Sequence, residues 1–224
     1  KLINDLAPDS KYIVVVAQED GSIEDPKPED LYSYGTLAQV LKVFDMPDNS
    51  KSAIVQGISR VKILEYLQND PYFTVSINLL EDGKITDPLE VDALTNNLRQ
   101  AFEELMKVAP NLTEEHSGML KNIQKPNRLT DRAISVITIS NQEKQEILEE
   151  LNIKTRLEKA LNLISREIQR IKLGEEIQSE VHDEITKTQR EYYLREQMKA
   201  IKKELGEDEG TVESKELEEK IKAA

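Results

Sequence analysis

Two histidines and a large number of carboxylates are the side chains of this sequence that could carry acid–base or metal chemistry. His116 and His182 lie far apart in the chain, and the 224 residues include no cysteine, which excludes thiolate metal sites and cysteine nucleophiles. The 43 Asp and Glu residues make chance pairs unavoidable, so a solvated surface is the expected role for most of them. No phosphate-binding glycine loop, serine elbow or His-Glu-x-x-His motif occurs. We therefore expect no catalytic, cofactor-binding or metal-ligating residue.

The charge of the chain argues against two classes of partner. It carries 30 Lys and Arg against 43 Asp and Glu, a net charge of −13. Binding to nucleic-acid phosphates or to anionic membranes needs clustered cations, so neither partner is expected. No apolar run of about 18 residues is present to span a membrane, and no signal-peptide pattern opens the chain. The lack of a signal-peptide pattern, together with the lack of cysteines, indicates a reducing, cytosol-like compartment.

The elements that must position any functional surface change character along the chain. All eight prolines lie at or before Pro126, and the remainder is rich in Glu, Lys, Leu and Ile, a composition typical of helix. The first part instead holds β-branched runs separated by turn residues. The sequence predicts an α+β protein with a small, mainly antiparallel, barrel-like β domain at 1–86, a helical bundle at 87–173, and a long projecting helix with an acidic linker at 174–224.

Within the β part, four or five strands are expected, in the stretches 12–17, 36–44, 52–64 and 73–79, with a short helix near 2–6 and a bulge near Gly57 between two strands. The last strand alternates cleanly, which puts its four apolar side chains on one face; these are Phe73, Val75, Ile77 and Leu79.

Local signals mark where the helices begin. Asp87-Pro-Leu-Glu90 combines an N-cap, a first-turn proline and a capping Glu, and Ser140 to Glu143 repeats the capping box. Thr113 is expected to open a short helix, and Thr130 or Asp131 to cap another after a break at Pro126. Asn152 is expected to cap the last and longest helix, 153–206.

The long helix changes its apolar face near Gly174. Leu157, Leu161, Ile164, Ile168 and Ile171 share one side, whereas Leu173, Ile177, Val181 and Ile185 fall on the far side. A helix that drifts steadily would not turn its stripe so abruptly. We expect an unbroken helix that leaves the bundle near Leu173. Its candidate inter-subunit contacts are Ile177, Val181, Ile185, Tyr192, Tyr193, Leu194, Met198, Ile201 and Leu205.

The stretch Thr188–Gly206, TQREYYLREQMKAIKKELG, is the most specific segment of the chain. It resembles the helix that precedes the ATPase module in Lon proteases. Other segments match the family's amino-terminal region in order: Val15–Asp20 (VVAQED), Asp30–Thr36 (DLYSYGT), Val55–Val61 (VQGISRV), Arg128–Asp131 (RLTD), Glu143–Leu148 (EKQEIL) and Arg156–Lys159 (RLEK). The resemblance covers essentially the whole chain.

This resemblance implies a non-catalytic region of an ATP-dependent protease that assembles as a hexamer. The region would bind unfolded or damaged proteins and help organise the ring, with other subunits of the same protease as partners. ATP, Mg and the Ser–Lys catalytic pair would belong to later parts of the family's chain. The implied location is the bacterial cytoplasm, with the mitochondrial matrix as the alternative. Family members also carry an earlier strand segment with a Pro-Leu-Arg run, which is missing ahead of Lys1; the β domain is therefore expected to lack its first strands.

Three other interpretations stay open at this point. The first is a free-standing coiled-coil chaperone or adaptor, which would also need a long helix. The second is an RNA-binding barrel, which the acidic charge opposes. The third, an enzyme in its own right, is the least supported. Under the Lon interpretation, the face of Phe73, Val75, Ile77 and Leu79 is the candidate substrate contact, through apolar contact or strand addition. The alternative is that this face belongs to the core. We expect the chain alone to be a monomer or a weak dimer.

Overall fold

The computed structural model describes residues 2–5, 12–47, 50–205 and 221. Residues 48–49, between the strands expected at 36–44 and 52–64, and most of the expected acidic linker lie outside these residues. Contacts divide the chain into two compact units, Lys1–Arg170 and Ile171–Ala224. The change from strands to helices falls between Leu80 and Pro88, inside the first unit. The domain limits at 86 and 173 stay predictions.

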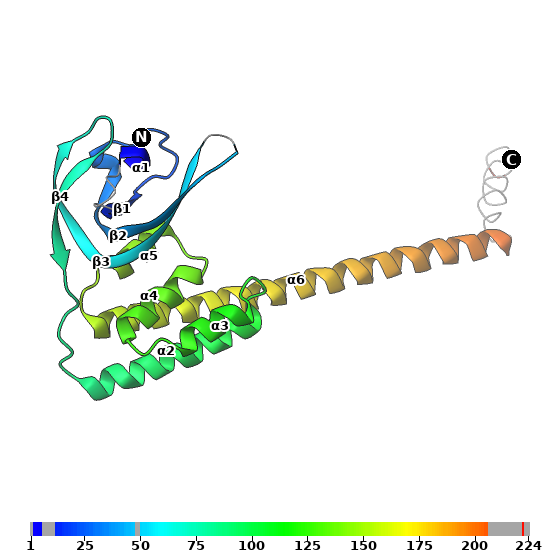
Figure 1. The fold of residues 1–224 in the computed structure, drawn as a ribbon. Helices are drawn as coiled ribbons and strands as arrows, with labels where there is room; N and C mark the ends of the chain where they lie inside the picture. The colour runs from blue at the N-terminus through cyan, green and yellow to red at the C-terminus, as the bar shows by residue number, and fades with distance from the viewer. Residues whose placement is uncertain (1, 6–11, 48–49, 206–220, 222–224) are drawn as a thin grey trace. The chain divides into compact units, whose positions relative to one another are not determined.

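The β part is a four-stranded antiparallel sheet in the order β1-β2-β3-β4 (Figure 1). Its strands are β1 (Tyr12–Gln18), β2 (Leu31–Asp45), β3 (Lys51–Gln68) and β4 (Thr74–Leu80), with the short helix α1 (Leu2–Asp5) before them and a 3-10 turn, η1 (Pro28–Asp30), ahead of β2. All four predicted strands and the antiparallel class are confirmed; β2 and β3 are longer than expected.

Two glycines set the local geometry of the sheet. Leu37 pairs with Ser59 and Ala38 with Gly57, so β3 has one extra residue there, which is the bulge predicted near Gly57. A Cβ added at Gly35 would lie 2.5 Å from the carbonyl oxygen of Val15. Glycine at this position therefore permits the close approach of β1 to β2.

Four helices follow the sheet: α2 (Pro88–Val108), α3 (Glu114–Lys121), α4 (Pro126–Val136) and α5 (Asn141–Glu149). The predicted caps at Asp87 and Ser140 are confirmed, since each side chain accepts a hydrogen bond from the backbone of the residue three positions later. The predicted start of α4 is wrong. The helix begins at Pro126, which needs no amide donor in a first turn, and the Thr130 hydroxyl donates to the Pro126 carbonyl inside the helix.

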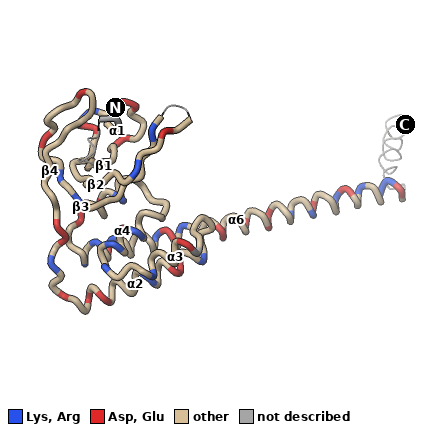
Figure 2. The backbone as a smooth tube through the Cα atoms, in the orientation of Figure 1, with Lys and Arg blue, Asp and Glu red and all other residues tan. Residues whose placement is uncertain are grey.

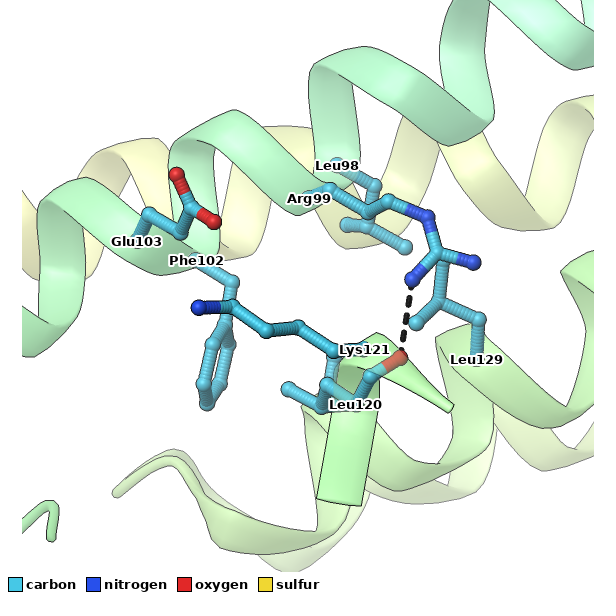
Figure 3. A pocket seen from close by; sticks show the side chains of 8 residues that line it. Leu98, Arg99, Phe102, Glu103, Leu120, Lys121 and Leu129 are labelled. Carbon is cyan, nitrogen blue, oxygen red and sulfur yellow. Dashed lines mark hydrogen bonds between the residues drawn. The ribbon is translucent and has the colours of Figure 1, made fainter. Parts of the chain in front are cut away.

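The helical core is made of apolar side chains from α2, α4, α5 and α6, among them Leu98, Leu105, Leu129 and Leu157, which are almost fully buried. A small cavity of about 30 Å³ lies between α2, α3 and α4. Leu98 and Leu129 are among the side chains that line it (Figure 3). The Arg99 guanidinium donates to the carbonyl of Leu120 over 2.8 Å and also to that of Ile123. It thereby ties the end of α3 to α2.

The last helix, α6 (Ile153–Glu204), is 52 residues long and continuous through Gly174, as predicted. The Asn152 side chain accepts from the amide of Thr155 at 3.1 Å, which confirms the predicted cap. The predicted contrast in burial is confirmed as well. Ile164 and Ile168 are 0% and 6% exposed, whereas Ile177, Val181 and Ile185 are each 51% exposed.

A buried polar cluster joins the sheet to the helices within the first unit, and we call it the Asp82 junction. Arg156 of α6 is fully buried; it donates to Asp82 over 2.5 Å and to the carbonyl of Glu150 over 2.6 Å. Asn127 of α4 also donates to Asp82, at 2.5 Å. Arg60 of β3 lies 3.6 Å from Asp82 and donates to Asp131 of α4 at 2.5 Å.

Electrostatics inside the junction favour the charged form of Asp82. Burial by itself would raise the pKa of this carboxyl. The hydrogen bonds from Asn127 and Arg156, together with the positive charges of Arg156 and Arg60, outweigh burial and hold the pKa below its usual range. The junction therefore stabilises the fold through an ionised carboxylate.

Replacing Arg156 with Met is expected to lower the free energy of unfolding by about 3–5 kcal/mol, because it removes one partner of a buried ion pair. The matched control is Lys154→Met on the same helix. Lys154 pairs with Glu90 at 2.8 Å, but both side chains are 43% exposed, and such pairs contribute little. Urea unfolding followed by circular dichroism measures both variants, and equal losses would contradict the assignment of the junction as the main tie.

The junction also predicts the acid stability of the protein. Since the folded state lowers the pKa of Asp82, its contribution is complete above the unfolded pKa of about 3.9 and is lost as the pH falls through the folded value. Asp82→Asn should therefore be less stable than the parent at pH 6, and its stability should fall less between pH 6 and pH 3. Asp183→Asn on the exposed part of α6 is the control. Parallel stability curves for parent and Asp82→Asn would refute the prediction.

Candidate functional site

An apolar groove of about 740 Å³ runs along one face of the sheet. The strand register explains why its side chains gather there. Val14 pairs with Leu37, and Tyr66 pairs with Val75, and paired residues point to the same face of a sheet. The groove is lined by Leu2, Tyr12, Ile13, Val14, Val16, Asp25, Pro26, Leu31, Leu37, Ile63, Tyr66, Asn69, Pro71, Tyr72, Phe73, Thr74 and Val75.

The opposite face of the sheet packs against the helices. Arg60 on β3 reaches the carbonyl of Leu148 at 2.9 Å and the carboxylate of Asp131. Ile63 lies three positions further along the same strand, so it points to the other face, where it lines the groove. The helices thus cover one face and leave the apolar groove open on the other.

Tyr66 is one of the residues that line the groove. Its hydroxyl is buried and has no hydrogen-bond partner among the described residues, and burial raises the pKa of its phenol. The Phe73 ring stands edge-on to the Tyr66 ring, with centroids 5.6 Å apart. Tyr66 therefore contributes its aromatic ring to the lining, while its polar atom is buried.

Only half of the predicted contact face takes part in the groove. Phe73 and Val75 line it, while Ile77 and Leu79 do not. Ile77 is half-buried opposite Ile63, and Leu79 is 57% exposed. Tyr66 was not among the residues that the sequence analysis singled out, because its position in the groove depends on the pairing of β3 with β4. The role of these side chains in binding stays a prediction.

The nine candidate inter-subunit contacts all lie in the unit Ile171–Ala224. Each side chain is more than half exposed, from 51% for Ile177 to 69% for Leu205. One of them also forms a polar contact, since Gln197 donates a hydrogen bond to the Tyr193 hydroxyl at 3.1 Å. Contact of these side chains with other subunits stays a prediction.

Within the described part of the chain, no three His, Asp or Glu side chains lie close enough together to hold a metal ion. No helix of residues 2–5, 12–47 and 50–205 is both long and apolar enough to cross a bilayer.

The relatives that are similar in sequence are named Lon protease, and a solved structure that is similar in fold is a domain of a Lon protease. The chain is 42% identical to the Lon protease of Koribacter versatilis (strain Ellin345) over 226 residues, covering 100% of this chain and 28% of that protein. It is 40% identical to the Lon protease of Anaeromyxobacter dehalogenans (strain 2CP-C), covering 92% of this chain and 24% of the relative. The chain therefore spans about a quarter of the length of these relatives.

A solved structure shares the fold. It is the N-terminal domain of the Mycobacterium avium complex Lon protease, with a TM-score of 0.52, 19% identity, and coverage of 68% of this chain and 90% of that one. The family model for the substrate-binding domain of the ATP-dependent protease La (LON) matches residues 1–166. Because this match extends over well more than half of the chain, the protein belongs to the family of the LON substrate-binding domain.

Proposed function

We propose that this chain is the non-catalytic substrate-recognition region of an ATP-dependent Lon-type protease, and that it holds unfolded or damaged protein segments in the sheet groove. The observation that carries the proposal is the groove of about 740 Å³, whose lining is mostly apolar. Its size falls within the range of about 300–1,000 Å³ typical of ligand sites.

An unfolded chain offers what such a groove can bind. Its apolar side chains are exposed to water, and burying them in the groove removes that surface from solvent. Its backbone amides and carbonyls are also unpaired, so they are free to form hydrogen bonds with the groove. Both β1 and β4 have a single neighbour in the described sheet and both line the groove, so a bound segment can also pair with a strand edge.

The rest of the activity is proposed from the relatives, which are named Lon protease and extend far beyond the shared region. ATP and Mg binding and peptide-bond cleavage would take place in that further part. The recognition region would act in the bacterial cytoplasm, within a hexamer. The exposed apolar side chains of α6, among them Ile177, Val181 and Ile185, support contacts between subunits, because an apolar helix face is stabilised when a second surface covers it.

Phe73→Asp is expected to weaken binding of a permanently unfolded, alkylated model protein by about tenfold, because it places a charge in the apolar groove. Leu79→Asp is the matched control, since Leu79 is exposed near the end of the same strand but lies outside the groove. Fluorescence anisotropy measures both affinities, and circular dichroism checks the fold. Equal weakening by the two variants, or none by Phe73→Asp, would rule out the groove as the site.

We further expect the 224-residue chain alone to be a monomer or a weak dimer at micromolar concentration. The segment Leu194–Leu205 supplies only about two heptads of apolar stripe, and isolated helical pairings of that length are marginal. Analytical ultracentrifugation measures the assembly state. A tight hexamer of this chain would show that the chain assembles without the rest of the protease.

A further inference from the structure

The loop between β1 and β2, residues 19–30, brings a cluster of negative charge to the groove, and we call it the acidic loop. It holds six carboxylates and a single cation, Lys27, and can be followed by its red segments in Figure 2. Asp25 and Pro26 of this loop belong to the groove lining. The loop therefore forms part of the rim of the groove.

Two of the six carboxylates have partners inside the loop. Asp20 accepts hydrogen bonds from Ser22, and Asp30 accepts one from the amide of Lys27 at 2.8 Å. The other four, Glu19, Glu24, Asp25 and Glu29, are exposed and form no ion pair with the described residues. These four carboxylates are thus available to a bound segment.

Cations of the sheet do not offset this charge inside the groove. No Lys or Arg is among the described residues that line it. Arg60 is engaged with Asp131, and the Lys62 ammonium lies 5.3 Å from the centre of the Tyr34 ring. Among the described residues of the lining, the only charged side chain is the carboxylate of Asp25.

We propose that the groove selects unfolded segments whose apolar residues are flanked by Lys or Arg. This inference rests on the proposed function and adds a preference to it. The apolar lining accepts the side chains at the centre of the segment, and the acidic loop attracts cations on either side of them. Because screening in physiological salt limits such attraction to about 8 Å, and an extended chain advances about 3.3 Å per residue, the preference concerns two or three flanking positions.

The test compares three peptides that share one aromatic and aliphatic centre and carry Lys, Ser or Glu at the two flanking positions on each side. In low salt, the Lys-flanked peptide is expected to bind the 224-residue chain roughly five- to tenfold more tightly than the Glu-flanked one. The difference in affinity between these two peptides should shrink in 0.5 M NaCl. This comparison uses the unmodified chain. Anisotropy titrations give all affinities.

Two charge-matched variants locate the effect. Glu24→Gln, Asp25→Asn and Glu29→Gln together should abolish the discrimination, while Glu175→Gln, Glu176→Gln and Glu180→Gln on α6 should preserve it. Equal binding of the three peptides, or discrimination that survives in the loop variant, would overturn the inference and leave the groove intact as a site. Failure of all three peptides to bind would count against the proposed function as well.

Discussion

The ionised carboxylate of Asp82 is the interaction on which the arrangement of the first unit depends. It accepts hydrogen bonds from Arg156 and Asn127 and lies near Arg60, so one side chain connects the sheet with α4 and α6. A buried guanidinium is costly unless a negative partner is held beside it. Arg156 is fully buried. Its charge is therefore stabilised only while the segment after β4 holds the Asp82 carboxylate beside it.

The junction decides which face of the sheet the helices cover. Arg60 turns one face toward α4 and α5, and the side chains that alternate with it are left on the other. An antiparallel sheet with one covered face usually carries polar residues on its open face. Here the open face holds Val14, Leu37 and Val75 instead. An exposed apolar surface of this kind is the feature by which a binding site is recognised.

Burial also changes along α6, between its first-unit part and its second-unit part. Along α6, Leu157 and Ile164 are buried, while Ile177 and Val181 are half exposed, although the residue types hardly differ. Gly174 lies where the apolar face changes, and a Cβ there would meet no neighbouring atom. The glycine therefore serves no packing need among the described residues. Its helix stays continuous because the residues on both sides are good helix formers.

Local chemistry alone determined much of this protein from its sequence. The caps at Asp87, Ser140 and Asn152 act within three residues, and the strands at 12–17 and 73–79 follow from alternation and β-branching, so none of them needs a distant partner. The absence of catalytic motifs and the family resemblance of Thr188–Gly206 also required no structure.

Only the tertiary structure determines which residues meet in the groove and in the junction. Asp82 meets Arg156 across 74 positions, and Arg60 meets Asp131 across 71, separations over which no sequence period carries information. The register of β3 with β4 brings Tyr66 beside Phe73, and shifting that register by one residue would turn every side chain to the other face. Alternation placed Phe73 and Leu79 on one face, but only packing could show that the groove contains the first and not the second.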